Sequence, residues 1–300
     1  MSRVKVERNI SYDEGRDTYY VYMDLGQDET GARVRKYKTY PTLTLARKGL
    51  RAFLAERESR KMVAPSSMTL DQWLDYWMEQ VIRPGRAETT VYGYQKIIDN
   101  HLSPALGSVP LQQLSPRHIQ QYYTSLLRDK GLAPNTIRRH HDLLSAALHT
   151  AVRQDVLLRC PTERVEPPKV VPREVHFYGP ENLKRLYALS EGTALELPIR
   201  LAGGLGLRRE EICGLKWSSV DFHLRRIHIC AARTSAGANI VEKETKNRSS
   251  TRVLHMADDL YRLLRREWSR QAENRLAAGS AWRESGLVLV DKFGAPWPPN

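Results

Sequence analysis

The stretch from Gly206 to Trp217, GLRREEICGLKW, holds the residues whose types and spacing could do chemistry. Its glycine allows a tight turn that places Arg208 at the start of a predicted helix, where an anion is favoured. Glu211 follows three residues later on the same helical face, so its carboxylate can hold the guanidinium in place. A fixed arginine suits phosphoryl transfer, because negative charge grows on the non-bridging oxygens. A surface ion pair on a capped helix explains the same pattern.

A second stretch, KETKNRSSTRVL over residues 243–254, lies between two segments that are predicted as strands. A long side chain at such a turn can reach into a groove. A mobile lysine beside a phosphate oxygen can act as general acid for a leaving 5′-hydroxyl. Lys243 and Lys246 both satisfy this description. The alternative is a polar β-turn without a chemical role. Without other evidence, the composition of residues 243–254 favours this alternative.

Two proline-containing segments, at residues 62–67 and 165–172, divide the chain into three parts. These parts must position the residues of the two stretches described above. The second segment is predicted to be extended, because proline disfavours helix at the residue before it. We expect domains at 1–62, 66–168 and 172–300. The predicted fold is multidomain and mainly α with small β: a three-stranded sheet plus one helix, then an all-helical domain, then an α+β domain.

The N-terminal part opens with an aromatic and β-branched segment, Thr18–Met23, followed by a glycine-containing turn and a strand over 32–40. Alternation along this strand places Arg33, Arg35 and Tyr37 on one face. A small sheet with a basic face can enter the major groove of DNA, so these three residues are candidate DNA contacts. A solvated strand face is the alternative.

The middle part is predicted to be helical throughout. Thr69–Gln72 forms a capping box before an apolar stripe that includes two tryptophans, which we assign to the core. Ser115 and Pro116 are predicted to cap and to open a later helix.

A helix predicted over residues 135–151 carries a basic edge near its start. Arg138, Arg139 and His141 lie off its apolar stripe, beside a helix N-terminus that suits phosphate contact. A solvated charged face is the alternative. The candidate DNA contacts in the middle part are Lys96, Thr136, Arg138 and Arg139.

The C-terminal part mixes helices and strands. Helices are predicted over 180–189, through 199–201 and from Arg208 to about Lys216, and a long one follows over 258–277. Strands are predicted over 226–230, 239–243 and 251–255, with a further one at Leu287–Val290.

The charge balance favours a polyanionic partner. The chain has 47 Lys+Arg against 34 Asp+Glu, a net charge of +13 and a pI near 9.7, which fits a nucleic acid or an anionic membrane surface. A membrane role has little support, because no apolar run approaches the roughly 20 residues of a spanning helix and no signal segment opens the chain. The three cysteines have no CxxC pair, which suits a reducing cytoplasm and outlines no metal site.

The order and spacing of these motifs resemble the tyrosine recombinase (phage integrase) family. Gly206-Leu207-Arg208, Glu211 and Leu215-Lys216-Trp217 match the box that carries the family's first catalytic arginine. The second stretch is similar to the family's Lys-Thr-x-x-Ser-x-Arg turn, and its matching residues are Lys246, Ser250 and Arg252. Helical-part matches are Thr90, Tyr94, His101-Leu102, Leu106-Gly107, Leu111, Leu114, Thr136 and Ala151-Val152. Departures are Glu210 for a small residue, Asn247 for threonine and Cys160 for the asparagine of Asn-Pro.

The resemblance implies a role for each part. Residues 1–62 resemble an arm-type DNA-binding domain of lambda-like and conjugative-transposon integrases, residues 66–168 a SAM-like core-binding domain, and residues 172–300 the N-terminal part of a catalytic domain. It implies Arg208 as phosphate clamp, Glu211 as its support, Lys246 as general acid, and Ser250 and Arg252 as DNA contacts. The expected activity is site-specific DNA cleavage and rejoining through a 3′-phosphotyrosine, without metal or nucleotide cofactor, by a homo-oligomer on double-stranded DNA.

The family's remaining catalytic groups are expected after the second motif. This chain has no His-x-x-Arg box there, and Tyr261 does not follow one, so we do not nominate it as the nucleophile. We therefore expect a C-terminally truncated recombinase that is inactive alone. The alternative is a non-catalytic DNA-binding remnant that occupies recombination sites. An RNA-binding module is a more distant alternative, since no RNP-like aromatic motif is visible.

Overall fold

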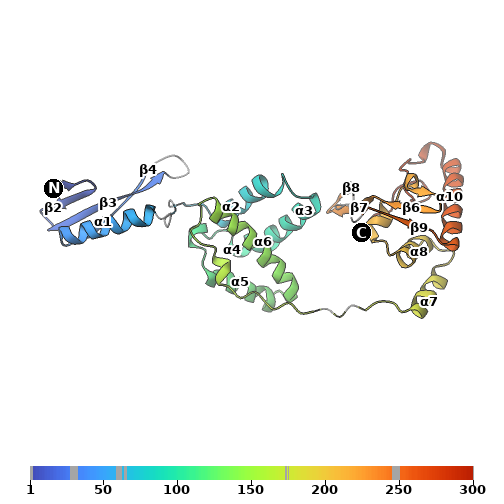
Figure 1. The fold of residues 1–300 in the computed structure, drawn as a ribbon, viewed down its shortest axis with the longest axis horizontal. Coiled ribbons are helices and arrows are strands. Elements are labelled where there is room, and N and C mark those ends of the chain that lie inside the picture. Colours follow the sequence, from blue (N-terminus) through green and yellow to red (C-terminus); the bar gives the residue numbers. More distant parts are fainter. Residues whose placement is uncertain are drawn as a thin grey trace. The chain divides into compact units, whose positions relative to one another are not determined.

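A computed structural model describes residues 3–27, 33–58, 63, 66–172, 174, 176–244 and 251–299. The chain forms two compact units, 1–172 and 173–300, and each is described by itself. Over the described ranges, four strands come first, helices follow up to residue 213, and five further strands precede a last long helix, so the fold is mixed helical with small sheets (Figure 1). Among the described residues, no helix combines the length and the apolar composition that crossing a membrane requires.

The N-terminal sheet has four antiparallel strands in the order β1-β2-β3-β4, where three were predicted. The strands are β1 (Arg3–Glu7), β2 (Ile10–Asp13), β3 (Thr18–Gln27) and β4 (Arg33–Tyr40), and α1 (Leu43–Glu58) follows them. The prediction missed the β1-β2 hairpin, which turns at Asn9 with φ 65°. Asparagine tolerates this left-handed conformation, so a short charged segment can still pair as an edge strand.

One face of this sheet packs against α1. Ile10 and Val21, which are opposite each other in the β2-β3 register, are buried with Ala46 of α1. The Thr42 hydroxyl accepts a hydrogen bond from the Leu45 N–H at 3.3 Å and caps the helix. Alternation therefore leaves Tyr20 and Tyr22 of β3 on the opposite face.

The rest of the first unit is helical and has a single apolar core, as predicted. Its α-helices are α2 (Leu70–Trp77), α3 (Glu88–Ile97), α4 (Ser103–Leu106), α5 (Pro116–Arg128) and α6 (Pro134–Arg153). The predicted capping box at Thr69 and Gln72 is present, and Ser115 caps α5 with Pro116 at its first position. Both tryptophans of α2, Trp73 and Trp77, are buried, which confirms their assignment to the core.

The second unit combines two small sheets with four α-helices among the described residues. The helices are α7 (Pro180–Ser190), α8 (Glu196–Leu205), α9 (Arg209–Cys213) and α10 (Asp258–Ala278). The strands are β5 (Val220–Asp221), β6 (Arg226–Ile229), β7 (Ala231–Ala236), β8 (Asn239–Glu244) and β9 (Arg252–His255), in sheets β5-β6-β9 and β7-β8. Leu201, Ile227, Leu264 and Val288 are fully buried at its centre.

Two predictions for this unit are wrong. Leu287–Val290 is buried but forms only isolated bridges, through Leu287 with Lys216 and Val290 with Pro296. An apolar run indicates burial, and burial does not require a strand. The helix expected to reach Lys216 ends at Cys213. Gly214 then packs on β7 so closely that a Cβ there would lie 2.8 Å from the backbone nitrogen of Arg233.

Candidate nucleic-acid interface

Arg208 owes its position to the break between α8 and α9. Gly206 caps α8 in the left-handed conformation, with φ 63° and ψ 29°, which glycine adopts at no steric cost. Leu207 is buried, and Arg208 is the extended N-cap residue of α9. Because α9 has only five residues, the guanidinium rather than a helix dipole must provide any attraction for an anion.

Glu211 is the centre of a three-residue ion-pair cluster with Arg208 and Arg252. Its carboxylate accepts the Arg208 backbone N–H at 2.9 Å and an Arg208 guanidinium N–H at 3.1 Å. Arg252, at the start of β9, donates to both carboxylate oxygens, at 2.9 and 2.8 Å. The Glu211 side chain is only 3% exposed. The fork from Arg252, together with the N–H bonds from Arg208, lowers the pKa of Glu211 to about 2 against the opposing effect of burial.

The cluster keeps a surplus of positive charge close to solvent. Two guanidinium groups share one carboxylate, so the three side chains carry one net positive charge. The Arg208 side chain is 66% exposed and that of Arg252 is 28% exposed. Both guanidinium groups can therefore contact an anion while they keep their hydrogen bonds to Glu211. A phosphate group, whose non-bridging oxygens can accept paired N–H groups from a guanidinium fork, fits this arrangement.

Strand pairing explains how Arg252 reaches the cluster. Arg252 lies opposite Ile229 in the β6-β9 register, and Ile229 is buried, so both point to the inner face of the sheet. Strands β8 and β9 belong to different sheets, so residues 245–250 connect two sheets. Lys246 and Ser250, the other predicted residues of this motif, lie outside the described residues.

The predicted DNA-contacting residues of β4 lie on the sheet face opposite α1. Arg33, Arg35 and Tyr37 are all exposed along this strand, and Tyr37 is opposite Tyr22. Sequence reasoning missed Arg3, whose guanidinium lies 3.9 Å from the centre of the Tyr20 ring and donates to the Tyr22 hydroxyl at 3.2 Å. The face therefore combines cations with tyrosine rings. Period-two alternation over Thr18–Met23 was the signal that could have identified its tyrosines.

Three of the four candidates in the helical part line one groove. Lys96 on α3, and Thr136 and Arg139 on α6, border a hollow of about 630 Å³. Arg138 is not among the residues that line this hollow, and it pairs with Asp142 at 3.6 Å.

The two adjacent histidines near the start of α6, His140 and His141, do not add to the basic edge. His140 is buried and bonded to the Tyr122 hydroxyl at 2.7 Å, and burial lowers its pKa to about 4. His141, predicted as part of that edge, bonds to the Tyr123 hydroxyl at 2.9 Å, and burial lowers its pKa as well. Both side chains are therefore held neutral near pH 7 and join α5 to α6.

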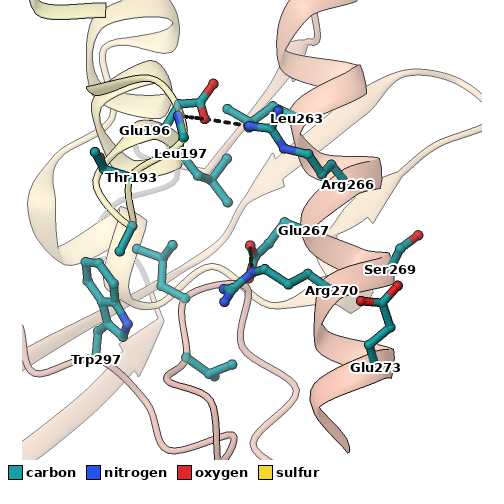
Figure 2. Close-up of a pocket in the computed structure, with 14 residues that line it drawn as sticks. Thr193, Glu196, Leu197, Leu263, Arg266, Glu267, Ser269, Arg270, Glu273 and Trp297 are labelled. Atoms are coloured by element: carbon teal, nitrogen blue, oxygen red, sulfur yellow. Dashed lines mark hydrogen bonds and ion pairs between the residues drawn. The ribbon is translucent and has the colours of Figure 1, made fainter. Parts of the chain in front are cut away.

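A second hollow, of about 450 Å³, is lined by α8, α10 and the residues Leu289, Val290 and Trp297 (Figure 2). Its arginines are already paired: Arg266 with Glu196 at 2.5 Å and Arg270 with Glu267 at 2.6 Å. An anion would have to compete with these carboxylates, so this hollow is a poorer phosphate site than the Glu211 cluster.

Comparison with known proteins places both units in one group. Residues 69–127 match the phage integrase N-terminal SAM-like domain, and residues 177–296 match the phage integrase family. The tyrosine recombinase XerC-like protein of Caldanaerobacter subterraneus subsp. tengcongensis is 24% identical over 299 residues, covering 93% of this chain and 76% of that protein.

Two solved structures share the fold. The Tn1549 transposon integrase in complex with circular intermediate DNA has a TM-score of 0.62 at 20% identity, covering 77% of this chain and 74% of that one. A lambda integrase dimer bound to a COC′ core site has a TM-score of 0.55 at 16% identity, covering 100% and 79%.

Proposed function

Since the chain belongs to the phage integrase family of tyrosine recombinases, we propose that it binds double-stranded DNA at a recombination site and serves in site-specific strand cleavage and rejoining. The main observation behind this proposal is that the guanidinium groups of Arg208 and Arg252 both donate hydrogen bonds to the buried carboxylate of Glu211. Two preorganised guanidinium groups can stabilise the charge that develops on a phosphate in the transition state without reorganising during the reaction.

In this reaction, a tyrosine oxygen bonds to the scissile phosphorus and the 5′-oxygen leaves, giving a 3′-phosphotyrosine. Arg208 and Arg252 hold the two non-bridging oxygens, and Glu211 fixes both arginines. We assign Lys246 as the general acid that gives its proton to the departing 5′-oxygen. Ser250 and Arg252 also contact the DNA backbone near the scissile phosphate.

None of the three tyrosines of the second unit is proposed as the nucleophile. Tyr187 lies under the guanidinium of Arg200 at 4.2 Å, and Tyr261 packs edge-on against Phe222 at 5.8 Å with Arg225 over its ring at 4.8 Å. Tyr178 is 70% exposed in the segment before α7. We propose that the attacking tyrosine lies outside these 300 residues and that the chain alone does not cleave DNA.

The remaining candidates divide into two DNA-binding surfaces. We propose that residues 1–62 are an arm-type domain whose Arg33, Arg35 and Tyr37 face enters a groove of DNA. We propose that residues 66–168 are a core-binding domain whose groove, lined by Lys96, Thr136 and Arg139, contacts phosphates. Residues 172–300 then form part of the catalytic domain. The lambda relative is a dimer on its DNA site, and we propose a homo-oligomer on DNA for this protein also.

Neutralising single phosphates tests the role of the arginines. A DNA duplex that the chain retains from a random library is resynthesised with a methylphosphonate at each backbone position in turn. One position should weaken binding by about 10- to 100-fold, the usual range for losing a charge-assisted hydrogen bond. Arg208→Ala should reduce that sensitivity, because only Arg252 then contacts the phosphate. Arg209→Ala is the matched control and should keep it, and equal sensitivity in both variants would remove Arg208 from the phosphate site.

The Lys246 assignment needs a form of the protein that cleaves. In that form Lys246→Ala should slow cleavage by about 10²- to 10⁴-fold. A 5′-bridging sulfur should restore most of the rate, because a thiolate leaves without a proton. An unchanged rate in Lys246→Ala on ordinary DNA, or no rescue by sulfur, would show that Lys246 is not the general acid.

A further inference from the structure

The segment that follows α6 runs back along that helix. Residues 161–164 form the short 3-10 helix η4, and residues 165–172 have neither helix nor strand structure. Val165 is buried in the helical core at the start of this segment, whereas Val170 and Val171 are each 57% exposed, so burial of apolar surface does not hold the later part of the segment in place. Besides Val165, polar side chains connect η4 and this segment to the helices at three places.

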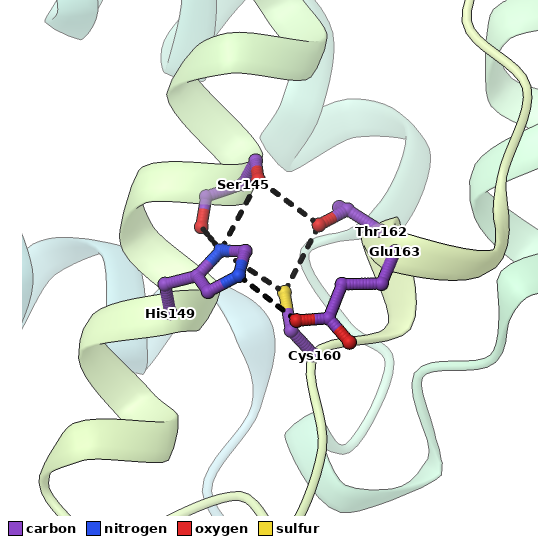
Figure 3. Close-up of polar contacts among 5 residues, drawn as sticks. All are labelled: Ser145, His149, Cys160, Thr162 and Glu163. Atoms are coloured by element: carbon purple, nitrogen blue, oxygen red, sulfur yellow. Dashed lines mark hydrogen bonds and ion pairs between the residues drawn. The ribbon is translucent and has the colours of Figure 1, made fainter.

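The first anchor joins η4 to the C-terminal half of α6 (Figure 3). The Glu163 carboxylate lies 3.1 Å from His149 Nε2, and the Thr162 hydroxyl donates to the Ser145 hydroxyl at 3.1 Å. The Cys160 thiol is buried and lies 3.0 Å from Thr162 Oγ1. This polar cluster reverses the chain at the end of α6.

The second and third anchors are side-chain amides that each grip one residue of the segment. Gln120 of α5 donates to the Glu166 carbonyl at 3.4 Å and accepts the Glu166 N–H at 3.2 Å. Asn135 of α6 does the same for Val171, at 3.1 and 3.2 Å. Each amide offers one donor and one acceptor, as a neighbouring peptide group in a sheet would.

The order of the anchors gives the direction of the segment. From His149 to Asn135, α6 rises about 21 Å at 1.5 Å per residue. From Glu163 to Val171 the chain can span at most about 26–29 Å. An extended segment antiparallel to α6 covers that distance. It ends beside the first turn of α6, next to Thr136 of the candidate DNA groove.

We propose that Gln120 and Asn135 are positioning residues that strap the segment 166–171 to the helical part. The strap makes the tether of the second unit begin next to the DNA groove instead of at the far end of α6. With it closed, residues 172–179, eight in number, separate the last anchor from α7. With it open, fourteen residues, 166–179, separate the buried Val165 from α7. The functional part of this proposal rests on the proposed DNA binding.

Tether length sets how strongly the two units cooperate on one DNA. The greatest span rises from about 26–29 Å for eight residues to about 46–50 Å for fourteen. Effective concentration falls with roughly the −3/2 power of length, which predicts about a twofold decrease when the strap opens.

Hydrogen–deuterium exchange of the full chain without DNA tests the strap itself. The Glu166 and Val171 amides should be protected, and Gln120→Leu with Asn135→Leu should speed their exchange about tenfold, the equivalent of one hydrogen bond of ordinary strength. Gln121→Leu and Asn182→Leu are matched controls on exposed helix positions and should leave the rates unchanged. The melting temperature should stay within the range of the controls. Equal rates for these two amides in the wild type and the double variant would overturn the strap.

A second measurement tests positioning separately. On a duplex that contacts both units, the double variant should bind about twofold more weakly than the wild type. On a shorter duplex that contacts only the first unit, the two should bind equally. If the double variant exchanges faster but binds both duplexes as tightly as the wild type, the strap exists but does not position the second unit. This conclusion does not depend on whether the protein is a recombinase.

Discussion

Replacing Glu211 with glutamine tests the physical account of the arginine cluster. The substitution keeps the size of the side chain and removes the charge that both Arg208 and Arg252 use. Arg252 would then keep its guanidinium, 28% exposed, beside a neutral amide that cannot accept both of its N–H groups. We expect the second unit to lose stability and both arginines to lose their fixed orientation.

The magnitude follows from the pKa of Glu211, which is lowered from 4.5 to about 2. At 1.36 kcal/mol for each pKa unit, the native contacts of the carboxylate stabilise the folded state by about 3 kcal/mol. Because the folded-state pKa is the lower one, this contribution is complete above about pH 5. It is lost as the pH falls through the folded pKa toward 2.

Urea unfolding followed by tryptophan fluorescence measures this effect, because four of the six tryptophans (Trp217, Trp268, Trp282 and Trp297) lie in the second unit. Glu211→Gln should lower the free energy of unfolding by about 3 kcal/mol at pH 7, and the difference from wild type should shrink between pH 5 and pH 2. Glu210→Gln is the control, since Glu210 makes no ion pair with any residue whose structure is described. A pH-independent difference would refute the electrostatic reasoning.

Three further outcomes are expected. Gly214→Ala should destabilise the second unit by about 1–3 kcal/mol in urea unfolding, because the new Cβ would clash with the backbone of β7. Gly204→Ala is the control. Its Cβ would lie in open space within α8, so this change should be neutral or stabilise the unit by up to about 1 kcal/mol. Tyr122→Phe should cost the first unit about 1–3 kcal/mol by leaving buried His140 unsatisfied; an unchanged unfolding midpoint would argue against this buried bond. Arg35→Ala should reduce the slope of log affinity against log salt by about 1 in a DNA-binding titration, and an unchanged slope would place Arg35 away from phosphate.

Local sequence signals were sufficient for the features that depend on near neighbours. The capping box at Thr69 and the Ser115-Pro116 helix start were predictable because each involves residues within three positions. The contact between Arg208 and Glu211 was predictable for the same reason. Their spacing within one helical turn fixes which side chains can meet.

Features that depend on the tertiary arrangement were not predictable from pattern alone. Arg252 meets Glu211 across 41 positions, and only the β6-β9 register points it inward. Strand β7, AARTSA, was missed because its small side chains give a weak strand signal. The sequence also did not show which of the two adjacent arginines near the start of α6 lines the groove. In the structure Arg139 lines it, whereas Arg138 pairs with Asp142.

The most direct test of the central claim is a selection for DNA. The full chain is incubated with a random-sequence duplex library, and the retained duplexes are sequenced at salt concentrations from about 50 to 200 mM. The account predicts enrichment of one sequence family, with an affinity that falls steeply as salt rises. It further predicts that Arg208→Ala weakens binding to the enriched duplex while Arg209→Ala does not. Retention without any sequence preference would contradict a site-specific recombinase.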